Sequence, residues 1–258
     1  MTGKTAVVTG GSRGLGRAIA TALDRAGVKV TVVARDEARL AQVRTETEGR
    51  VATRAGDATD QAFADSVMRE VRPDILVLFA GARPPKAPIH EHTWESFSAP
   101  WNSDVKSTFY WTQAAMKLPL APGSTVLIAR SGAGMGGSPL SGGYAGAKRT
   151  QWIMADYLQR ESNAAKLGIH FHAVIPRSII ADSEMGSAAV DSYAELAGVT
   201  REKYLERFGK VVTTAGVARG VLAILEAPPV DAAAYVVLED RVLPVGVGFS
   251  MAEFGALK

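Results

Sequence analysis

The sequence contains no cysteine among its 258 residues, and this absence excludes several kinds of chemistry at once. Without thiols the chain has no disulfide framework, no thiolate metal site and no cysteine nucleophile. A cysteine-free chain suits a reducing compartment, so we expect a cytoplasmic protein. A chain of this length buries most of the surface that it exposes when unfolded, and it therefore needs no covalent cross-links.

Long apolar runs and a one-sided charge are also missing. No stretch approaches the roughly 18 consecutive apolar residues of a membrane span, and the N-terminus lacks the features of a signal peptide. The formal net charge is only +3 with both signs interspersed, whereas nucleic-acid binders usually carry a basic stripe. His90 and His92 lack an obvious third ligand. We therefore expect no metal, no membrane contact and no nucleic-acid partner.

Apolar, β-rich runs alternate with amphipathic helical patterns along the chain. Strands are predicted at 5–9, 28–34, 51–56, 74–80, 124–129, 169–175 and 234–238, and helices at 15–26, 37–48, 61–71, 101–118 and 144–167. Strands that are apolar on both faces are typical of parallel sheets with helices on both sides. The pattern predicts an α/β fold: a doubly wound, Rossmann-type, mostly parallel seven-stranded sheet with helices on both faces.

No repeat or linker divides the chain, so we predict one dinucleotide-binding and catalytic domain over residues 1–258. The alternation of strands and helices breaks after the sixth strand, where residues 182–209 are more polar and helical. Ligands bind at the carboxyl ends of the strands in this architecture. We therefore predict that residues 182–209 form a flap over the substrate.

A glycine-rich turn from Thr9 to Gly16 joins the first predicted strand to the first helix. Glycines let the backbone approach a pyrophosphate closely, and the helix that follows offers free N–H groups. The spacing Gly-x-x-x-Gly-x-Gly differs from the commoner fingerprint, but its place at the first strand–helix junction is the required context. We predict that a dinucleotide binds to Gly10, Ser12, Arg13, Gly14, Leu15 and Gly16.

The end of the second strand distinguishes NAD(H) from NADP(H). An NAD site usually has an acidic residue there, which binds the ribose 2′-hydroxyl. Here the strand ends at Arg35, and the glycine-rich turn supplies Arg13. Two guanidinium groups can bind a 2′-phosphate through forked, charge-assisted hydrogen bonds. Although Asp36 follows directly, and Arg35 could be an ordinary surface residue, the pattern favours NADP(H).

Tyr144 and Lys148 lie four residues apart at the start of the predicted helix 144–167, so they share one helix face. A nearby positive charge favours the phenolate, and we expect Lys148 to lower the pKa of Tyr144. The phenol would then be a proton donor and acceptor near neutral pH. Ser131 follows the fifth strand, at the edge where ligands bind, and its hydroxyl could hydrogen-bond a substrate carbonyl.

Together these motifs resemble the short-chain dehydrogenase/reductase family over nearly the whole chain. Asp57 after the third strand, Ala80-Gly81 after the fourth and Pro176 after the sixth complete the pattern. The resemblance implies that Asp57 and Ala58 contact the adenine and that Ala80 and Gly81 line the cofactor pocket. It also implies that Tyr144 and Lys148 contact the cofactor, Lys148 at the nicotinamide ribose, and that the nicotinamide is flanked by Pro176 and Ile179.

The same resemblance implies an activity and an assembly. A hydride would pass between NADP(H) and a carbonyl or secondary alcohol, with Ser131 orienting the oxygen, Tyr144 transferring the proton and Lys148 adjusting Tyr144. A homodimer or homotetramer is expected. Two rival functions remain open: an isomerase or dehydratase on the same scaffold, and a regulatory module that binds NADPH without catalysis.

Two positions depart from the family pattern. Asp104 stands where the family has an asparagine that serves a water-mediated proton relay to the lysine, so Asp104 is either a working relay or a sign of altered chemistry. Arg177 replaces the glycine that usually follows Pro176. Arg177, alone or with Arg83, would attract an acidic substrate group; alternatively it points to solvent or contacts the cofactor phosphate.

Overall fold

The computed structural model describes residues 1–83, 86–227, 232–246 and 248–257, and a single sheet lies at its centre. The strands are β1 (Thr5–Thr9), β2 (Lys29–Ala34), β3 (Ala52–Ala55), β4 (Ile75–Leu78), β5 (Thr125–Ala129), β6 (His170–Pro176), β7 (Ala234–Val237) and β8 (Val242–Val245). Their order is β3-β2-β1-β4-β5-β6-β7-β8. Strands β1 to β7 pair in parallel, and β8 pairs antiparallel with β7. The predicted doubly wound sheet is confirmed, with one antiparallel strand more than the seven expected.

Helices cover both faces of the sheet. One face carries α1 (Gly14–Arg25), α2 (Glu37–Glu46) and α10 (Thr214–Glu226), and the other carries α3 (Gln61–Val71), α5 (Lys106–Lys117) and α7 (Tyr144–Ala164). A hydrophobic core lies between the sheet and the helices on each face. Strand β4 contributes to both cores: Ile75 and Val77 pack on the side of α1, α2 and α10, and Leu76 and Leu78 pack on the side of α3, α5 and α7. Because both faces of a parallel strand are buried, polar residues are excluded from both.

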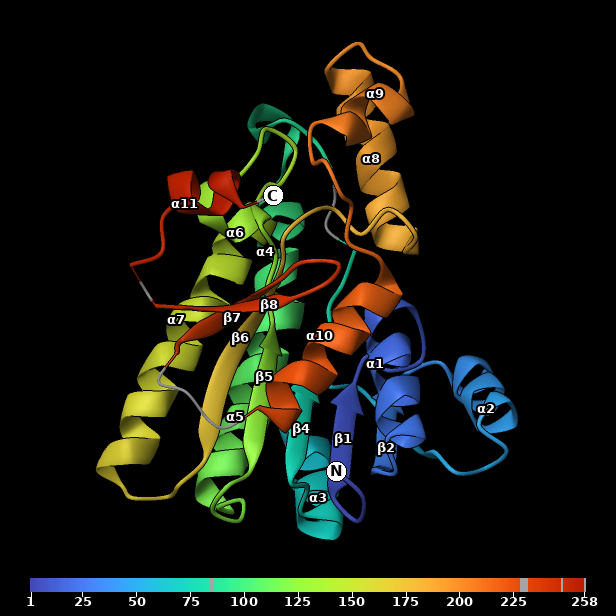
Figure 1. Cartoon of the computed structure of the whole chain (residues 1–258), viewed down its shortest axis with the longest axis vertical. Coiled ribbons are helices and arrows are strands. Elements are labelled where there is room, and N and C mark those ends of the chain that lie inside the picture. The colour runs from blue at the N-terminus through green and yellow to red at the C-terminus, as the bar shows by residue number, and fades with distance from the viewer. Residues whose placement is uncertain (84–85, 228–231, 247, 258) are drawn as a thin grey trace.

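Further helices gather beyond the carboxyl ends of the parallel strands, at the top of Figure 1. They are α4 (Trp94–Pro100), α6 (Ala133–Gly136), α8 (Glu184–Leu196), α9 (Arg201–Glu206) and α11 (Met251–Ala256). A 3₁₀ turn, η1 (Ile89–Glu91), precedes α4, and a π-helical stretch, η2 (Trp101–Val105), leads into α5. Within the described ranges, no helix has the length and apolar character that crossing a membrane requires. The loops after β1, β4, β5 and β6 all emerge at the carboxyl edge of the sheet, where ligands bind in this architecture.

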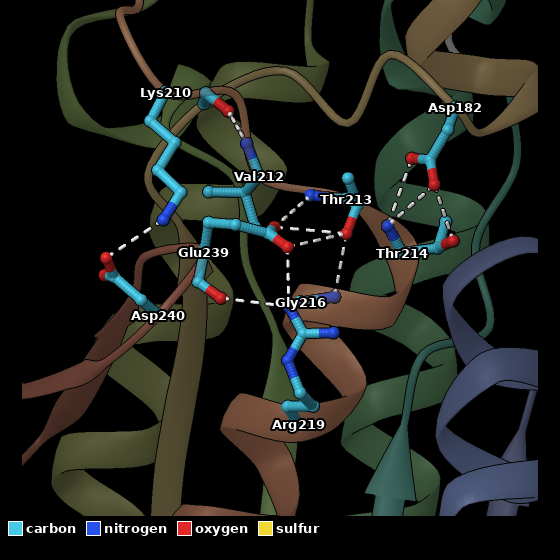
Figure 2. A network of polar contacts seen from close by, with 10 residues as sticks. Asp182, Lys210, Val212, Thr213, Thr214, Gly216, Arg219, Glu239 and Asp240 are labelled. Atoms are coloured by element: carbon cyan, nitrogen blue, oxygen red, sulfur yellow. Dashed lines mark hydrogen bonds and ion pairs between the residues drawn. The ribbon is translucent and has the colours of Figure 1, made fainter.

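The predicted flap at 182–209 folds into α8 and α9, and its stems are anchored (Figure 2). The Asp182 carboxylate accepts hydrogen bonds from the backbone N–H of Thr214, at 3.0 Å, and from its hydroxyl, at 2.8 Å. Glu239, which follows β7, accepts a hydrogen bond from the backbone N–H of Thr213 at 2.7 Å. Both ends of the segment are therefore fixed near the N-terminus of α10. Its role as a substrate flap stays a prediction.

Arg130 is an unusual residue of the core, directly after β5. Its side chain is buried, with the guanidinium carbon 3.8 Å from the ring centroid of Trp152 and Nη2 2.8 Å from the sulfur of Met135. Nε and Nη1 have no hydrogen-bond partner among the described residues. Burial, together with the positive charge of Arg149, lowers the pKa of Arg130 to about 9. An unpaired charge is therefore held in the core beside Ser131, at a cost in stability.

We predict that Arg130→Met raises the melting temperature at pH 7, by about 2–4 °C for each kcal/mol of buried-charge cost removed. Since the unfolded chain binds a proton here that the folded chain loses above about pH 9, the cost is full below that pH. The gain should therefore shrink as the pH rises beyond 9. Thermal unfolding of both proteins across this pH range measures it, with Arg160→Met, at an exposed arginine of α7, as the control. A destabilised Arg130→Met variant at pH 7 would contradict the prediction.

Candidate active site

The glycine-rich turn lies between β1 and α1 with backbone packed too closely for side chains. A Cβ on Gly10 would lie 2.8 Å from the backbone of Ala80, and one on Gly16 would lie 2.4 Å from the carbonyl oxygen of Gly10. Gly14, which opens α1, faces open space instead. The turn therefore presents bare backbone at a helix N-terminus, a geometry that fits a pyrophosphate. Ser12 is buried within the turn and Leu15 is partly buried.

Three arginines meet at one carboxylate beside this turn, and we call Arg13, Arg39 and Arg83 the arginine cluster. Glu184, the first residue of α8, accepts from Arg13 at 3.0 Å and lies 3.8 Å from Arg39. It also pairs closely with Arg83. The hydrogen bond from Arg83 and the charges of the other two lower the pKa of Glu184. The predicted flap thus places the Glu184 carboxylate among the arginines beside the glycine-rich turn.

Arg13 and Arg35, the two residues expected to bind the 2′-phosphate, have different surroundings. Arg13 belongs to the arginine cluster, whereas Arg35 is exposed and makes no hydrogen bond or ion pair within the described part of the chain. Arg35 still lies close enough to Asp57 for its charge to contribute to lowering the pKa of that carboxyl. Arg39, one helical turn into α2, was missed by sequence reasoning, because an arginine in a charged helix looks like ordinary solvated surface.

The neighbouring strand ends carry the other residues expected around a cofactor. Asp57 accepts hydrogen bonds from the backbone N–H and hydroxyl of Thr59, at 2.8 and 2.9 Å, and these bonds lower its pKa. The carbonyl of Ala58 accepts from the indole of Trp111 at 3.0 Å. The backbone N–H of Ala80 donates to the Thr9 hydroxyl at 3.2 Å. The ends of β1 and β4 are thereby tied to one another, and the segment after β3 is tied to α5.

Ser131, Tyr144 and Lys148 are brought together at the same edge. Helix α7 begins at Tyr144, and the Lys148 ammonium lies 5.5 Å from the centroid of the Tyr144 ring. The Ser131 hydroxyl accepts from the backbone N–H of Ala133 at 3.2 Å, and it lies near enough to Tyr144 to lower the pKa of the phenol. A phenol, a hydroxyl and an ammonium group therefore share one small site.

The pKa of Tyr144 is raised overall, although Lys148 lowers it as expected. Burial is the largest cause, because it disfavours the phenolate. Lys148 and the hydrogen bond from Ser131 act in the expected direction, but the charge of Asp104 opposes them. The sequence indicated the charge of Lys148 but not the burial of the phenol, and burial has the larger effect on the pKa of Tyr144.

Asp104 lies in the π-helical stretch η2 and is an ion-pair partner of Lys148. Its Oδ2 is 2.9 Å from the Lys148 ammonium, and both side chains are buried. Its Oδ1 accepts from the backbone N–H of Ala82 at 3.0 Å and from the Ser103 hydroxyl at 2.7 Å. A Cβ on Gly81 would come within 2.9 Å of this carboxylate, so Gly81 makes room for it. The carboxylate is thus held from three sides.

Arg177 donates hydrogen bonds to the backbone of the segment around α11, and its attraction for an acidic substrate group stays a prediction. Its Nε donates to the carbonyl of Leu257 at 2.9 Å and its Nη2 to that of Gly255 at 3.0 Å. The guanidinium also lies 5.0 Å from the ring centroid of Phe254. That ring packs against Gly132, where a Cβ would approach it to 3.1 Å. Arg177 therefore anchors α11 beside the loop that carries Ser131.

The remaining predicted residues close the site on the β6 side. Pro176 ends β6, and Ile179 packs on the small core that α8 and α9 form. Arg83, proposed as a partner of Arg177, pairs with Glu184 instead. His92, for which the sequence offers no obvious third metal ligand, hydrogen-bonds Ser96 at 2.9 Å, and its buried Nε2 faces Gly142 next to the start of α7.

Comparison with known proteins gives the family. The model of the short chain dehydrogenase family matches residues 4–192. General stress protein 39 of Bacillus subtilis is 32% identical over 186 residues, which cover 69% of this chain and 64% of that protein. Sorbitol dehydrogenase of Cereibacter sphaeroides is 28% identical over 241 residues, which cover 89% of this chain and 92% of that protein. The match thus spans less than two thirds of the first relative and nearly all of the second.

Solved structures share the fold. A dehydrogenase/reductase from Sinorhizobium meliloti has 27% identity and a TM-score of 0.74 over 87% of this chain and 88% of its own. A point variant of actinorhodin polyketide ketoreductase, solved with NADPH, has 24% identity and a TM-score of 0.76 over 88% and 93%. With the family match over more than half of its length, the chain belongs to the short-chain dehydrogenase/reductase family of oxidoreductases.

Proposed function

We propose that this oxidoreductase uses NADP(H) to interconvert a carbonyl compound and a secondary alcohol. The observation that carries the proposal is the meeting of Ser131, Tyr144 and Lys148 at the sheet edge that also carries the glycine-rich turn. A phenol beside a hydroxyl and an ammonium group is a positioned proton donor. A module that only bound the dinucleotide would not need such a donor.

The residues around the turn fit a dinucleotide. Gly14 faces open space at the N-terminus of α1, and the close backbone packing at Gly10 and Gly16 keeps the turn tight enough for a pyrophosphate to approach it. By family resemblance, Lys148 would hold the nicotinamide ribose, while Pro176 and Ile179 would flank the nicotinamide. Asp57 and Ala58 would contact the adenine, with Ala80 and Gly81 lining the pocket. When bound, NADP(H) supplies the hydride, and the protein provides orientation and charge.

The side chains then act on the substrate oxygen. Ser131 donates a hydrogen bond that orients the carbonyl, and Tyr144 gives its hydroxyl proton to the oxygen as negative charge develops there. The ammonium of Lys148 stabilises the phenolate left behind. These groups lie in a buried site, where fixed dipoles and charges act more strongly than in water. In the opposite direction, the phenolate accepts the proton of the alcohol.

Several contacts support NADP(H) over NAD(H). Asp36, the acidic residue nearest the end of β2, accepts from the backbone N–H of Arg39 at 3.0 Å as the N-cap of α2. It also pairs with the Arg39 side chain at 3.3 Å. That carboxylate is therefore engaged, while Arg13 and Arg39 stand beside the turn as phosphate ligands.

The ion pair of Asp104 favours redox chemistry over the elimination or isomerisation alternative. An enzyme of the latter kind needs a free base near the substrate. Asp104 is instead paired with Lys148 and accepts two further hydrogen bonds. Its role is therefore to act on Lys148.

We further propose a homodimer or homotetramer assembled through α5 and α7. Phe109 on α5 and Ile153 and Tyr157 on α7 are among the large apolar side chains exposed to solvent. Exposed apolar groups on adjacent helices are typical of subunit contacts. Sedimentation or light scattering of the purified chain would measure the assembly.

We predict that NADPH binds more tightly than NADH and that Arg13→Ala and Arg39→Ala each weaken NADPH binding about tenfold or more, as expected for one charge-assisted phosphate contact. NADH binding should change much less, because NADH lacks the 2′-phosphate. Fluorescence or calorimetric titration measures both ligands. Arg50→Ala is the control, since Arg50 pairs with Asp24 and Glu48 outside this edge. Equal losses for both cofactors would show that the arginines do not bind the 2′-phosphate.

Glu184→Gln should have the opposite effect on the same titration. Its carboxylate occupies the arginine cluster, so it competes with a cofactor phosphate for the same donors. The neutral amide removes that competition, and NADPH should bind more tightly. Weaker binding by Glu184→Gln would mean that the carboxylate instead orders the arginines for the cofactor.

Tyr144→Phe should lower the rate of NADPH oxidation with any accepted carbonyl substrate by about 10²- to 10⁴-fold, because the proton donor is lost. NADPH binding should be retained, since the ring is unchanged. Tyr157→Phe, an exposed tyrosine on the same helix, is the matched control. Turnover of Tyr144→Phe at the wild-type rate would remove Tyr144 from the mechanism.

A further inference from the structure

The Lys148 ammonium is held by two side chains other than Tyr144. The Asp104 carboxylate lies 2.9 Å from it, and the amide oxygen of Gln151 accepts from it at 2.8 Å. Gln151 lies three residues after Lys148, so both occupy one face of α7. All three side chains are buried, and Gln151 is fully buried. The ammonium therefore has fixed partners and little freedom to move.

Gln151 also ties Lys148 to the helix that carries Asp104. Its amide nitrogen donates to the backbone carbonyl of Asp104 at 3.2 Å and to the hydroxyl of Thr108 at 2.7 Å. The amide thus uses its acceptor on α7 and its donors on η2 and α5. A fully buried amide with its donors and acceptor occupied defines one geometry, because any other would leave a polar group unsatisfied.

We propose that Asp104 and Gln151 are positioning residues that hold Lys148 as a fixed, charge-neutralised ammonium, so that Tyr144 keeps its proton at neutral pH and the site is set for carbonyl reduction. This inference rests on the proposed function, whose proton donor is Tyr144. Gln151 has no role in the family pattern described above. Asp104 acts through Lys148 rather than on the substrate.

The charges around Tyr144 give the physical reason. Lys148 on α7 favours the phenolate, whereas Asp104 on η2 and Tyr193 on α8 disfavour it, and Ser131 contributes a hydrogen bond. A carboxylate 2.9 Å from the ammonium cancels much of the ammonium's field at the phenol. Burial and Asp104 together raise the pKa of Tyr144. Burial alone would lower the pKa of Lys148, but Asp104 and Tyr144 raise it.

The proton balance follows from this arrangement. During reduction the Tyr144 O–H bond breaks and its proton goes to the alkoxide oxygen formed from the carbonyl, while NADPH is oxidised to NADP⁺. Tyr144 is left as a phenolate beside a Lys148 that remains an ammonium group. Oxidation of an alcohol needs the phenolate at the start. Its rate should therefore rise with pH up to the pKa of Tyr144, and the reduction rate should fall only above that pKa.

Two substitutions test the proposal in opposite directions. Asp104→Asn removes the opposing charge, and the midpoint of both pH profiles should move down by about one pH unit or more. Gln151→Glu adds a carboxylate beside the ammonium, and the midpoint should move up.

Gln151→Leu tests the positioning of Lys148 without changing the charge of the site. The ammonium loses its hydrogen-bond acceptor, so kcat should fall about tenfold while KM for NADPH stays within about twofold. Gln113→Leu, at a partly buried glutamine on α5 that hydrogen-bonds Gln61, is the control.

A readout without turnover separates this inference from the proposed function. Ultraviolet titration of tyrosinate, with Tyr144→Phe subtracted, follows Tyr144 in the cofactor-free protein. Circular dichroism first establishes that each variant is folded. A lower midpoint for Asp104→Asn and a higher one for Gln151→Glu support the inference, even if no carbonyl is ever reduced. Unchanged midpoints in both folded variants overturn it, whether or not the enzyme reduces carbonyls.

Discussion

The buried ion pair between Lys148 and Asp104 is the interaction on which the candidate site depends. It joins α7, which carries Tyr144, to η2, and through Ala82 it reaches the segment that follows β4. Two charges held out of water cost free energy unless each is well paired, so neither partner can be removed alone without leaving the other exposed to that cost. The Lys148 ammonium can therefore be buried beside the Tyr144 phenol because the Asp104 carboxylate pairs with it.

Other charged side chains around the site also hold neighbouring segments together. Arg177 anchors the C-terminal helix α11 near the Ser131 loop, and Glu184 gathers the arginine cluster under the start of α8. Each places a chain segment at the rim of the site rather than acting as a free ligand.

The fold was predictable because its signals are local and repeated. Apolar strands such as β4 alternate with helices, and the glycine-rich turn marks the first junction. The missed elements have other causes. Helix α11 is short and depends on its contacts with Arg177, and β8 contains Pro244, which weakens any strand signal and suits an edge strand.

The positions of the site residues could be predicted from the sequence, but the effects that these residues have on one another could not. Tyr144 and Lys148 could be placed on one helix face from their spacing, and Ser131 at a strand end. The raised pKa of Tyr144 could not, because desolvation depends on how the surrounding loops pack. Gln151 and Arg39 carry no motif; their spacing from Lys148 and Asp36 was a usable signal, but only the tertiary contacts reveal what they bind.

Transfer of deuterium from NADPH labelled at its reactive carbon is the most direct test of the central claim. The labelled cofactor would be incubated with the protein and a panel of ketones and aldehydes, and the products analysed by mass spectrometry. The account predicts one deuterium on the carbinol carbon of at least one product, and almost none with Tyr144→Phe. Tight NADPH binding without deuterium in any product, or conversion to an unlabelled product, would contradict hydride transfer as the function of this site.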